Sequence, residues 1–549
     1  MLDLTPIIGA ADDVTNPFGT EQLAELDADE RFPDEACAAL DAAGLFRHYV
    51  PAAYGGALVD YWRLLQLVRT VAARDVTVAV AHAKTWLGGV SVWVGGGPGQ
   101  AYRLAERILD GDVISWGLTE RAHGSDLLDG EASAIRTATG WRLSGEKWLI
   151  NNATRGQLMC VLARTDQAGG PRGFSLFLVD KTALAPGSFT CLSKIRTLGI
   201  RGADISGIRL HGADLPHDAL VGEVGQGIET VLKALQVTRL LCAALSLGAA
   251  EHGLRLAGRF AAERSLYGRR LADLPQVRRT LGRAATALLV AEVTTLFAAR
   301  SVQVVPAEAS VLGAVTKSFV PTLVQSELDE LGELLGARGF LTDVYADGAF
   351  AKLERDHRIV SLFDGNTLVT RAGLIGQLPR LARAFRQAPP AGDEIAAAAT
   401  LDAPLPGLDL TRFSLSAPTC GALAVVPDVA RRVNADPNLP SEVRKLVVRL
   451  NRSVSALHHE MSQRAPGARA VPASAFGLAE RYEWCFAGAA ALHLWQYNRR
   501  RVTGPLWRDG LWLHAALARV LGGLRGSTPA AAAEVTDRMA EHYLATEDP

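Results

Sequence analysis

Cysteines are few in this sequence, and none of them is closely paired with another. The six cysteines among 549 residues lie far apart, at Cys37, Cys160, Cys191, Cys242, Cys420 and Cys485. Disulfide-rich secreted domains and zinc-binding modules need short, repeated spacings between cysteines, so both classes are excluded. We therefore expect reduced thiols, no metal site and a cytoplasmic location.

An excess of charge of either sign is also absent. Lys and Arg number 57 against 58 Asp and Glu, which gives a formal net charge of −1. Because nucleic-acid-binding domains typically carry a basic surplus, no nucleic-acid partner is predicted. No run reaches about 18 uninterrupted apolar residues, and the N-terminus lacks the basic and apolar segments of a signal peptide. We therefore predict no membrane span and a partner that is a small molecule or is carried by a protein.

Hydrophobic periodicity divides the chain into several domains. Apolar residues make up 48% of the sequence, and a chain of 549 residues exceeds what one core supports. A spacing of three to four residues predicts helices in most of the chain, whereas a spacing of two predicts an antiparallel β domain in its middle. The predicted fold class is α+β and multidomain, with an N-terminal helical domain (1–111), a middle β domain (112–222), a four-helix bundle (223–386), a Pro- and Ala-rich linker (387–410) and a C-terminal helical extension (411–549).

Five short motifs follow one another between residues 118 and 365. Taken alone, each has an ordinary interpretation, because Asp-Gly pairs form tight turns and glycines end helices. Their order and spacing are informative when they are taken together. The motifs are LTERAHGSD (118–126), GEKWLINN (145–152), RSLYGR (264–269), ELLGARGF (333–340) and RDHRIVSLFDG (355–365).

In identity, order and spacing, these motifs resemble those of the acyl-CoA dehydrogenase family of flavoproteins, over residues 18–385. The resemblance implies the fold of that family, FAD as the cofactor and α,β-dehydrogenation of an acyl thioester. It also implies an electron acceptor such as an electron-transfer flavoprotein. Some long-chain members of the family carry a C-terminal helical extension and form dimers, so the resemblance favours a homodimer.

The first two motifs correspond to the family's contacts with the flavin. Leu118, Thr119 and Ser125 occupy positions that bond the cofactor in the family, and Ser125 is also implied as a substrate contact. Leu149 stands where the family has a Trp that shields the flavin, and Asn151 stands where it has a Thr that donates a hydrogen bond. Asn151 can still donate through its amide. Donors at the ring suit hydride transfer, because the arriving hydride places negative charge there.

The next two motifs resemble segments that reach the cofactor across a subunit interface. Arg264 corresponds to an Arg that meets the FAD pyrophosphate, and Tyr267 corresponds to an aromatic residue near the adenine. Small residues in the second segment let backbone N–H groups approach a phosphate. The remaining residues that the resemblance assigns to the cofactor here are Gln276, Glu333 (a Gln in the family), Gly336 and Gly339.

Asp364 coincides with the catalytic Glu of the family, in the motif R-D-x-x-I-x-x-I-[YF]-E-G-T. The resemblance therefore implies Asp364 as the base, Phe363 and Gly365 as substrate contacts, and Asn366 and Thr367 as cofactor contacts. Aspartate is shorter than glutamate by about 1.5 Å of reach, and a misplacement of about 1 Å can cost roughly 100-fold in rate. Either the backbone lies closer to the flavin, or the substrate lies differently, or the reaction is not ordinary desaturation.

Other functions remain open. Nitroalkane oxidases, which are relatives with an Asp base, suggest an FAD oxidase; a flavin-dependent monooxygenase or a non-catalytic scaffold with structural FAD are further alternatives. The segment LQVTR resembles the family's thioester-binding D-x-x-R, with Gln236 in place of the Asp and with Arg239 retained, and both are implied substrate contacts. Loss of that Asp argues against a specifically CoA-bound substrate and fits a carrier-protein thioester. The predicted function is FAD-dependent α,β-dehydrogenation of an acyl thioester, with Asp364 as the base.

Overall fold

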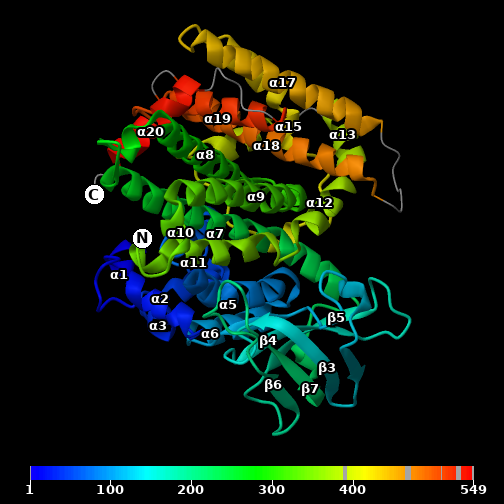
Figure 1. Ribbon diagram of the computed structural model, residues 1–549. Coiled ribbons are helices and arrows are strands. Elements are labelled where there is room, and N and C mark those ends of the chain that lie inside the picture. Colours follow the sequence, from blue (N-terminus) through cyan, green and yellow to red (C-terminus); the bar gives the residue numbers. More distant parts are fainter. Residues whose placement is uncertain (1, 388–391, 464–470, 508–509, 527–532, 547–549) are drawn as a thin grey trace. The chain divides into compact units, whose positions relative to one another are not determined.

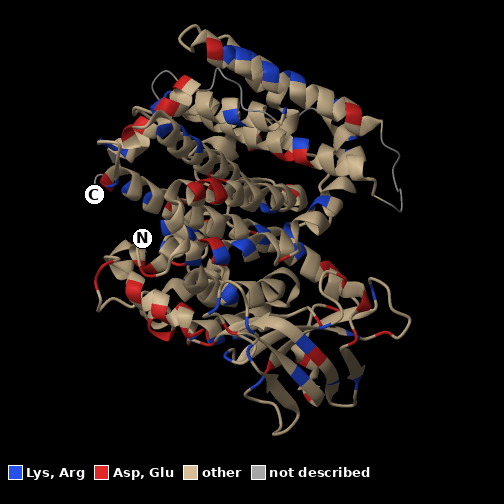
Figure 2. Ribbon diagram, viewed as in Figure 1, with Lys and Arg blue, Asp and Glu red and all other residues tan. Residues whose placement is uncertain are grey.

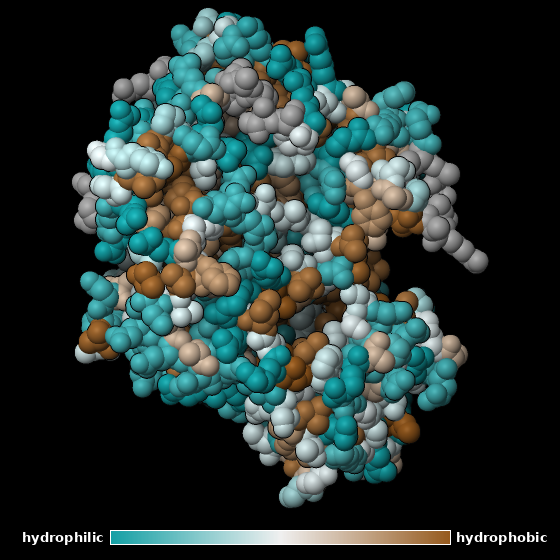
Figure 3. Space-filling model, viewed as in Figure 1, coloured by the Kyte–Doolittle hydropathy of each residue, from teal (hydrophilic) through white to brown (hydrophobic). Residues whose placement is uncertain are grey.

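The chain forms two compact units. The computed structural model describes residues 2–387, 392–463, 471–507, 510–526 and 533–546 (Figure 1). Unit 1 contains Met1–Thr238 together with Leu408–Leu415, and unit 2 contains Arg239–Gly407 and Ser416–Pro549. The boundary falls inside helix α7 (Gly227–Glu263), so the predicted four-helix bundle contributes to both units. Lys and Arg are interspersed with Asp and Glu along the elements (Figure 2), and on the visible surface apolar groups are interrupted by hydrophilic residues (Figure 3).

The N-terminal part of unit 1 is helical, as predicted. Asp60 and Asp75 cap the helices that begin at Tyr61 and Val76 by accepting hydrogen bonds from the backbone N–H groups of Trp62 and Val78. The second of these helices is buried almost all round, because it consists mainly of Val, Ala, Gly and Trp. The helices are α1 (Thr5–Ile8), α2 (Thr20–Ala28), α3 (Asp34–Ala42), α4 (Tyr61–Ala72), α5 (Val76–Gly95) and α6 (Pro98–Leu109).

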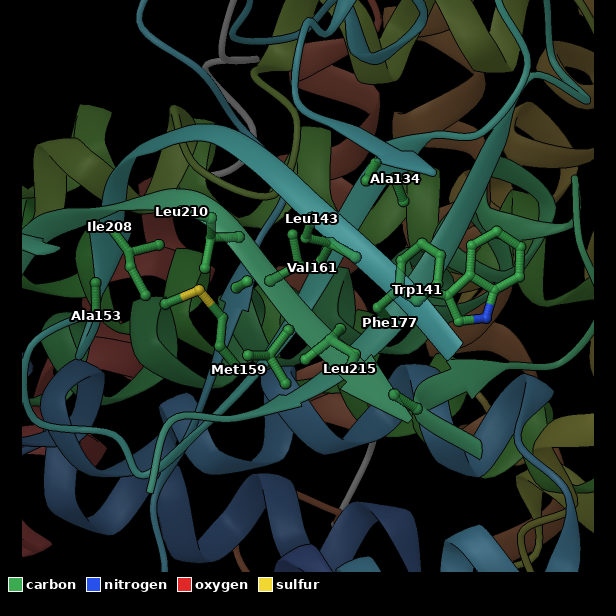
Figure 4. Close-up of a cluster of buried hydrophobic side chains, with 14 of the residues drawn as sticks. Ala134, Trp141, Leu143, Ala153, Met159, Val161, Phe177, Ile208, Leu210 and Leu215 are labelled. Atoms are coloured by element: carbon green, nitrogen blue, oxygen red, sulfur yellow. The ribbon is translucent and has the colours of Figure 1, made fainter. Parts of the chain in front are cut away.

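An eight-stranded sheet follows, in the order β6-β7-β3-β2-β4-β5-β8 with β1 on β4. Its strands are β1 (Ile114–Gly117), β2 (Ser133–Arg136), β3 (Gly140–Asn151), β4 (Leu158–Arg164), β5 (Phe174–Asp180), β6 (Phe189–Leu192), β7 (Ile205–Pro216) and β8 (Leu220–Val221). A core of alternating apolar side chains lies on it, with Trp141 edge-on to Phe177 at 5.2 Å (Figure 4). The prediction of an antiparallel domain was wrong in one respect, because β1 and β2 both pair with β4 in parallel. β1 and β2 pair with successive parts of β4, so the chain leaves the sheet after β1 and returns to it at β2. Residues 118–132 form this excursion.

Long apolar helices dominate unit 2. Helix α7 is followed by α8 (Pro275–Val304) and α9 (Ala309–Leu335), which pack against each other. The fourth helix of the predicted bundle (223–386) is instead divided into α11 (Ala349–His357), α12 (Thr367–Ile375) and α13 (Leu378–Gln387), with the short α10 (Ala337–Phe340) before them. The break between α11 and α12 has a local cause, because Asp364 and Gly365 have positive φ angles of 55° and 88°, which a right-handed helix does not accommodate.

Two helices of this part are long and apolar enough to cross a membrane by length and composition alone. They are α7 and α8, and 83% and 72% of their most apolar windows are buried inside the structure. Core helices of soluble proteins pass the same test, so the apolar residues of α7 and α8 are accounted for by the packed interior.

The C-terminal extension is helical and is part of unit 2. Its helices are α15 (Gly421–Ala424), α16 (Val426–Asn434), α17 (Ser441–Ser462), α18 (Ala473–Asn498), α19 (Leu511–Gly523) and α20 (Ala533–Thr546). Helix α8 packs against α18, α19 and α20. Of the predicted linker, residues 388–391 lie outside the described residues, and Gly392–Ala399 form helix α14. Arg300 of α8 donates hydrogen bonds to the carbonyls of Ala398 and Thr400, so the end of α14 is held to the bundle.

Glu308 connects the bundle to the extension through a buried carboxylate. It is 4% exposed, and its two oxygens accept the Gly421 N–H at 3.1 and 3.0 Å. Burial raises the pKa of Glu308 to about 7, although the Gly421 donor opposes the shift. The folded chain therefore keeps the Glu308 carboxyl protonated over a pH range in which the unfolded chain has lost this proton.

The stability that Glu308 contributes is accordingly expected to depend on pH. It is present in full below the unfolded pKa, near 4.3, and is lost as pH rises through about 7. The loss amounts to about 4 kcal/mol, at roughly 1.4 kcal/mol per pKa unit. Thermal unfolding between about pH 5 and 8 should show a downward slope that Glu308→Gln flattens, because glutamine does not titrate. Equal slopes for the two proteins would contradict this assignment.

Candidate functional site

The Asp364 segment is a turn between two helices. After α11 the chain forms a short 3-10 helix, Arg358–Ser361, and then adopts left-handed conformations at Asp364 and Gly365. Asn366 caps α12, and its side-chain oxygen accepts the Val369 N–H at 2.9 Å. Aspartate is one of the few residues that tolerate this conformation. Asn366, predicted as a cofactor contact, therefore has a structural role as a cap, and Thr367 is the first residue of α12.

Arg239 and a thiol contact Asp364, and a buried lysine contacts the segment just before it. Arg239 of α7 donates from Nε to the Asp364 carbonyl at 3.2 Å, and Cys242 Sγ lies 3.9 Å from Asp364 Oδ2. Lys317 of α9 is fully buried, and its Nζ donates to the Val360 carbonyl at 2.5 Å. Burial lowers the pKa of Lys317 and of Arg239, and the charge of Asp364 opposes both shifts. Burial also raises the pKa of the Cys242 thiol to about 12, so the thiol is neutral.

His357 lies behind this group and is also neutral. Its Nε2 is 2.9 Å from Ser246 Oγ, and its Nδ1 is 2.9 Å from Gln325 Oε1. Because the Gln325 carbonyl can only accept, Nδ1 carries the proton and Nε2 accepts from the serine. Burial and the nearby Lys317 charge lower the pKa of His357 to about 3. His357 therefore orders the helices without contributing charge.

The surface next to Asp364 is apolar. Leu362, Leu368 and Val369 are 60%, 66% and 39% exposed, although exposed large apolar side chains are usually isolated. Asp364 itself is half-buried. Among the described residues, no acceptor takes the Asp364 N–H. In such an apolar surround, a carboxylate can accept a proton from a carbon acid. The free N–H beside it can donate to the adjacent carbonyl oxygen.

In unit 1, the loop after β1 is closed by a buried ion pair. Glu120 accepts from Lys147 Nζ at 2.7 Å and from the N–H groups of Glu131 and Ala132 at 2.6 and 3.1 Å. Burial tends to raise the pKa of Glu120, but the Lys147 charge and these donors hold it below its usual value. Thr119 is bonded to Trp148 through its hydroxyl at 2.8 Å and through its carbonyl, which accepts the Trp148 N–H at 3.0 Å. The sequence interpretation missed the pair, although Glu120 and Lys147 both lie within its motifs.

Leu149 lies on a bulge of β3 and faces outward. Its φ is 59°, the register with β7 shifts between Trp148 and Ile150, and Leu149 is 45% exposed. The Arg121 guanidinium lies 4.7 Å from the Trp148 ring centre and 3.1 Å from Glu146. Strict alternation along the strand therefore ends at Leu149, and Arg121 orders the Trp148 side chain.

Asn151 is bonded to α5 through its amide. Its Nδ2 donates to the Val80 carbonyl of α5 at 2.9 Å, and within the described residues its buried Oδ1 has no partner. One of the two amide N–H groups is thus engaged, and the Oδ1 acceptor is left for a ligand. Leu118 and Thr119 are half-buried and Ser125 is exposed on the same excursion of residues 118–132.

The residues assigned to a shared cofactor lie on exposed segments of unit 2. The hairpin of β9 (Ser265–Leu266) and β10 (Arg269–Arg270) follows Arg264 and carries Tyr267, which is 88% exposed with φ of 54°. Gly336 ends α9 with φ of 58°, Gly339 is buried, and Phe340 is 84% exposed. Gln276 and Glu333 are also exposed. Two large aromatic side chains held out into solvent are typical of an interface with another molecule.

Two predicted substrate contacts are engaged by the protein itself. Gln236 is 2% exposed, and its Nε2 donates at 2.7 Å to the carbonyl of Ser414, in the segment Leu408–Leu415 that belongs to unit 1. Leu410 and Phe413 of that segment are 4% and 2% exposed. Gln236 is therefore sealed in unit 1, and Arg239 holds the Asp364 carbonyl. Phe363 and Gly365 remain half-buried next to the carboxylate.

In the part of the chain that the structure describes, no group of three or more His, Cys, Asp and Glu residues is arranged to hold a metal ion. All six cysteines are unpaired.

Comparisons with known proteins identify the architecture. Three family models match, which are acyl-CoA dehydrogenase N-terminal domain (10–112), middle domain (115–213) and C-terminal domain (225–377). The probable acyl-CoA dehydrogenase FadE25 of Mycobacterium tuberculosis is 27% identical over 353 residues, which are 63% of this chain and 88% of that protein.

Solved structures extend the likeness in fold to the C-terminal helices. An acyl-CoA dehydrogenase from Bacillus anthracis, complexed with FAD, matches with a TM-score of 0.71 at 17% identity, over 98% of this chain and 92% of that one. The prolyl acyl carrier protein oxidase AnaB matches with a TM-score of 0.60 at 19% identity, over 67% of this chain and 95% of that one. At these identities the likeness shows the fold alone, and it confirms the predicted fold class.

Proposed function

Because the chain belongs to the acyl-CoA dehydrogenase family, we propose that it is an FAD-dependent enzyme that removes hydrogen from the α and β carbons of an acyl thioester, with Asp364 as the base. The observation that carries the base assignment is the Asp364 turn. Asp364 ends the retained motif, is held through its carbonyl by Arg239 at 3.2 Å and is flanked by exposed apolar side chains. A turn residue without a catalytic role needs none of these surroundings.

The residues fit FAD at several points. The buried Asn151 Oδ1 lacks a donor among the described residues, and a flavin ring offers N–H groups. The exposed Leu149 on its bulge suits contact with a flat aromatic ring, and Leu118, Thr119 and Ser125 lie on the excursion next to it. Arg264 and Tyr267 suit the pyrophosphate and the adenine. When bound, FAD supplies the hydride acceptor for the β-hydrogen.

The protein's own groups account for the proton. The Asp364 carboxylate accepts the α-proton, and the Asp364 N–H donates to the thioester carbonyl, where negative charge develops. The bond from Arg239 to the Asp364 carbonyl holds the turn that carries this carboxylate. Leu362, Leu368 and Val369 exclude water from the reacting carbon.

Gln236 bears on whether the acyl group is carried by CoA or by a carrier protein. In this chain the group at that position is an amide, it is 2% exposed, and its nitrogen is bonded to Ser414. A substrate arm that depends on an acidic contact there is disfavoured, so a carrier-protein thioester is a candidate beside acyl-CoA. One protein with the same fold is a prolyl acyl carrier protein oxidase, which supports including this substrate class.

The assembly that we propose is a homodimer with FAD at its interface. Tyr267 and Phe340 are 88% and 84% exposed on the two segments assigned to a shared cofactor. Burial of these rings against a second copy of the chain would stabilise the dimer, because removing apolar surface from water is favourable. Sedimentation of the purified chain with FAD measures this directly, and a monomer would contradict it.

Anaerobic mixing tests the function. The oxidised-flavin absorbance should disappear on addition of acyl-CoA or acyl-carrier-protein thioesters. The thioester that bleaches it identifies the carrier of the acyl group. Bleaching by nitroalkanes alone would assign an oxidase of the kind that uses an Asp base. If only NAD(P)H or a reductase bleaches the flavin, the monooxygenase alternative replaces the dehydrogenase. A flavin that none of these reduces would indicate a structural role.

A further inference from the structure

We propose that the exposed arginines of helix α13 form a docking surface for an acidic acyl carrier protein, which delivers its thioester to the Asp364 site. The inference rests on the proposed function and selects one of its two substrate classes. The docking residues are Arg380, Arg383 and Arg386, and we call them the arginine row.

Helix α13 separates its apolar residues from its charged residues. Leu378, Leu381 and Ala382 are buried. The arginines recur at every third position and are all exposed, which places them along one face of the helix. The ring of Phe385 stacks on His458 of α17 at 3.9 Å. The helix is therefore anchored through its apolar side, and the arginine row faces solvent.

No negative charge of the protein balances the arginine row. From residue 365 to residue 392 the sequence contains neither Asp nor Glu. Among the described residues, no carboxylate forms an ion pair with the three side chains, and Arg380 Nη1 donates to the neutral Ser416 hydroxyl at 2.7 Å. Arg371, the other arginine of this stretch, is already bonded to two glutamates of α18. The row therefore presents three uncompensated positive charges.

Helix energetics do not account for this arrangement. Arg380 is the third residue of α13, in the first turn, where the helix dipole disfavours a cation. Side chains three residues apart are neighbours on a helix, so the like charges of the row also repel one another. Exposed arginines of other helices have a carboxylate four residues away, as in the pairs Arg259–Glu263 and Glu354–Arg358. A row without such a carboxylate is suited to bind negative charge on another molecule.

An acidic carrier protein fits the row in charge and in position. Acyl thioesters reach enzymes on CoA or on the phosphopantetheine arm of a carrier protein, and Gln236 disfavours an arm that needs an acidic contact. Helix α12 begins three residues after Asp364, and α13 follows it directly, so the row lies on the segment that continues from the base. Charge complementarity steers association and orients the partner, which a tethered substrate requires.

The test uses the FAD-loaded, full-length protein and an acyl carrier protein whose arm is flanked by Asp and Glu. One acyl group is offered on this carrier, on CoA and on pantetheine, which has no phosphate. In Arg380→Glu/Arg383→Glu/Arg386→Glu, kcat/KM for the carrier thioester should fall by about tenfold or more at low salt, through KM. The values for the CoA and pantetheine thioesters should not change. The difference from the wild-type protein should shrink as salt is added, because salt screens exposed charges.

A matched control reverses the same number of charges elsewhere. Arg136, Arg172 and Arg500 are exposed on three other segments, and their triple change to Glu should leave all three kcat/KM values unchanged. Calorimetric titration with the carrier bearing a thioether in place of the thioester measures docking without chemistry. A carrier whose acidic residues beside the arm are changed to Lys should bind the row variant more tightly than it binds the wild-type protein.

The outcomes separate docking from the proposed function. Docking is overturned if the wild-type protein does not bind the carrier, or if the row variant binds it equally well. An equal fall for the CoA thioester would assign the row to phosphate groups, and loss of binding to anionic phospholipid vesicles alone would assign it to a membrane surface; both results overturn the carrier as the partner. If the carrier binds through the row but no thioester reduces the flavin, the proposed function fails and the docking surface stands.

Discussion

Asp364→Asn is expected to keep FAD bound and to lower thioester-dependent flavin reduction by about 10²–10⁴-fold, the usual contribution of a general base. Asparagine has nearly the same shape, accepts the left-handed conformation at φ of 55° and retains the backbone N–H. The turn, the bond from Arg239 and the cap at Asn366 should therefore persist. Stopped-flow reduction and the flavin content of the purified protein measure the two effects separately.

The chain contains a matched control in Asp347. Asp347 precedes a glycine, has φ of 50° and lies in unit 2, as Asp364 does, but it is exposed in the short 3-10 helix Ala346–Gly348 before α11. Asp347→Asn should leave the reduction rate unchanged. If the two variants behave alike, Asp364 is a turn residue and the base assignment is wrong.

Local motifs allowed much of the fold to be predicted, because each depends on neighbours in the sequence. The helical and two-residue periods gave the order of the elements, and the Asp-Gly pair gave the turn at Asp364. Parallel pairing of β1 and β2 with β4 could not be anticipated, because it depends on where residues 118–132 bring the chain back to the sheet. Propensity also overestimated the last helix, since two residues with positive φ end it.

The site was predictable in its chain positions and not in its partners. The sequence identified Asp364 and Arg239 separately, and only the structure shows that Arg239 binds the carbonyl of Asp364 rather than remaining free for substrate. Gln236 looked like a substrate contact because the residue that covers it, Ser414, is far away in the sequence. The single Lys317 in an apolar helix was a sequence signal for a buried cation with a specific partner, because lysines are almost never fully buried unless they are paired.

The C-terminal extension is connected to the helix that follows the base. Arg371 of α12 donates from Nε and Nη2 to the two oxygens of Glu483 at 2.8 and 2.9 Å, and from Nη1 to Glu480 at 2.5 Å. Glu483, on α18, is 1% exposed. Helix α12 begins at Thr367, three residues after Asp364. The extension therefore holds the helix that begins directly after the Asp364 turn.

Arg371→Met is expected to lower the stability of unit 2 by about 3–5 kcal/mol, the usual cost of leaving one member of a buried ion pair without its partner. The double variant Arg371→Met/Glu483→Leu should recover most of this loss, because it leaves no charge to desolvate. Arg501→Met is the matched control. Its pair with Asp402 is 57% and 63% exposed, so a change of at most about 1 kcal/mol is expected. Denaturant unfolding of the three variants gives the comparison.

The loss in Arg371→Met should also grow with pH. Burial raises the pKa of Glu483 to about 7 even with Arg371 beside it, and removal of the cation raises it further. The variant can then keep Glu483 protonated at low pH, where the penalty is small, and must desolvate a charge or break the contact at higher pH. If the variant loses no more stability than Arg501→Met at any pH, the pair does not hold α18 to α12. If it loses stability as expected while flavin reduction is unchanged at low pH, the extension stabilises unit 2 without shaping the site.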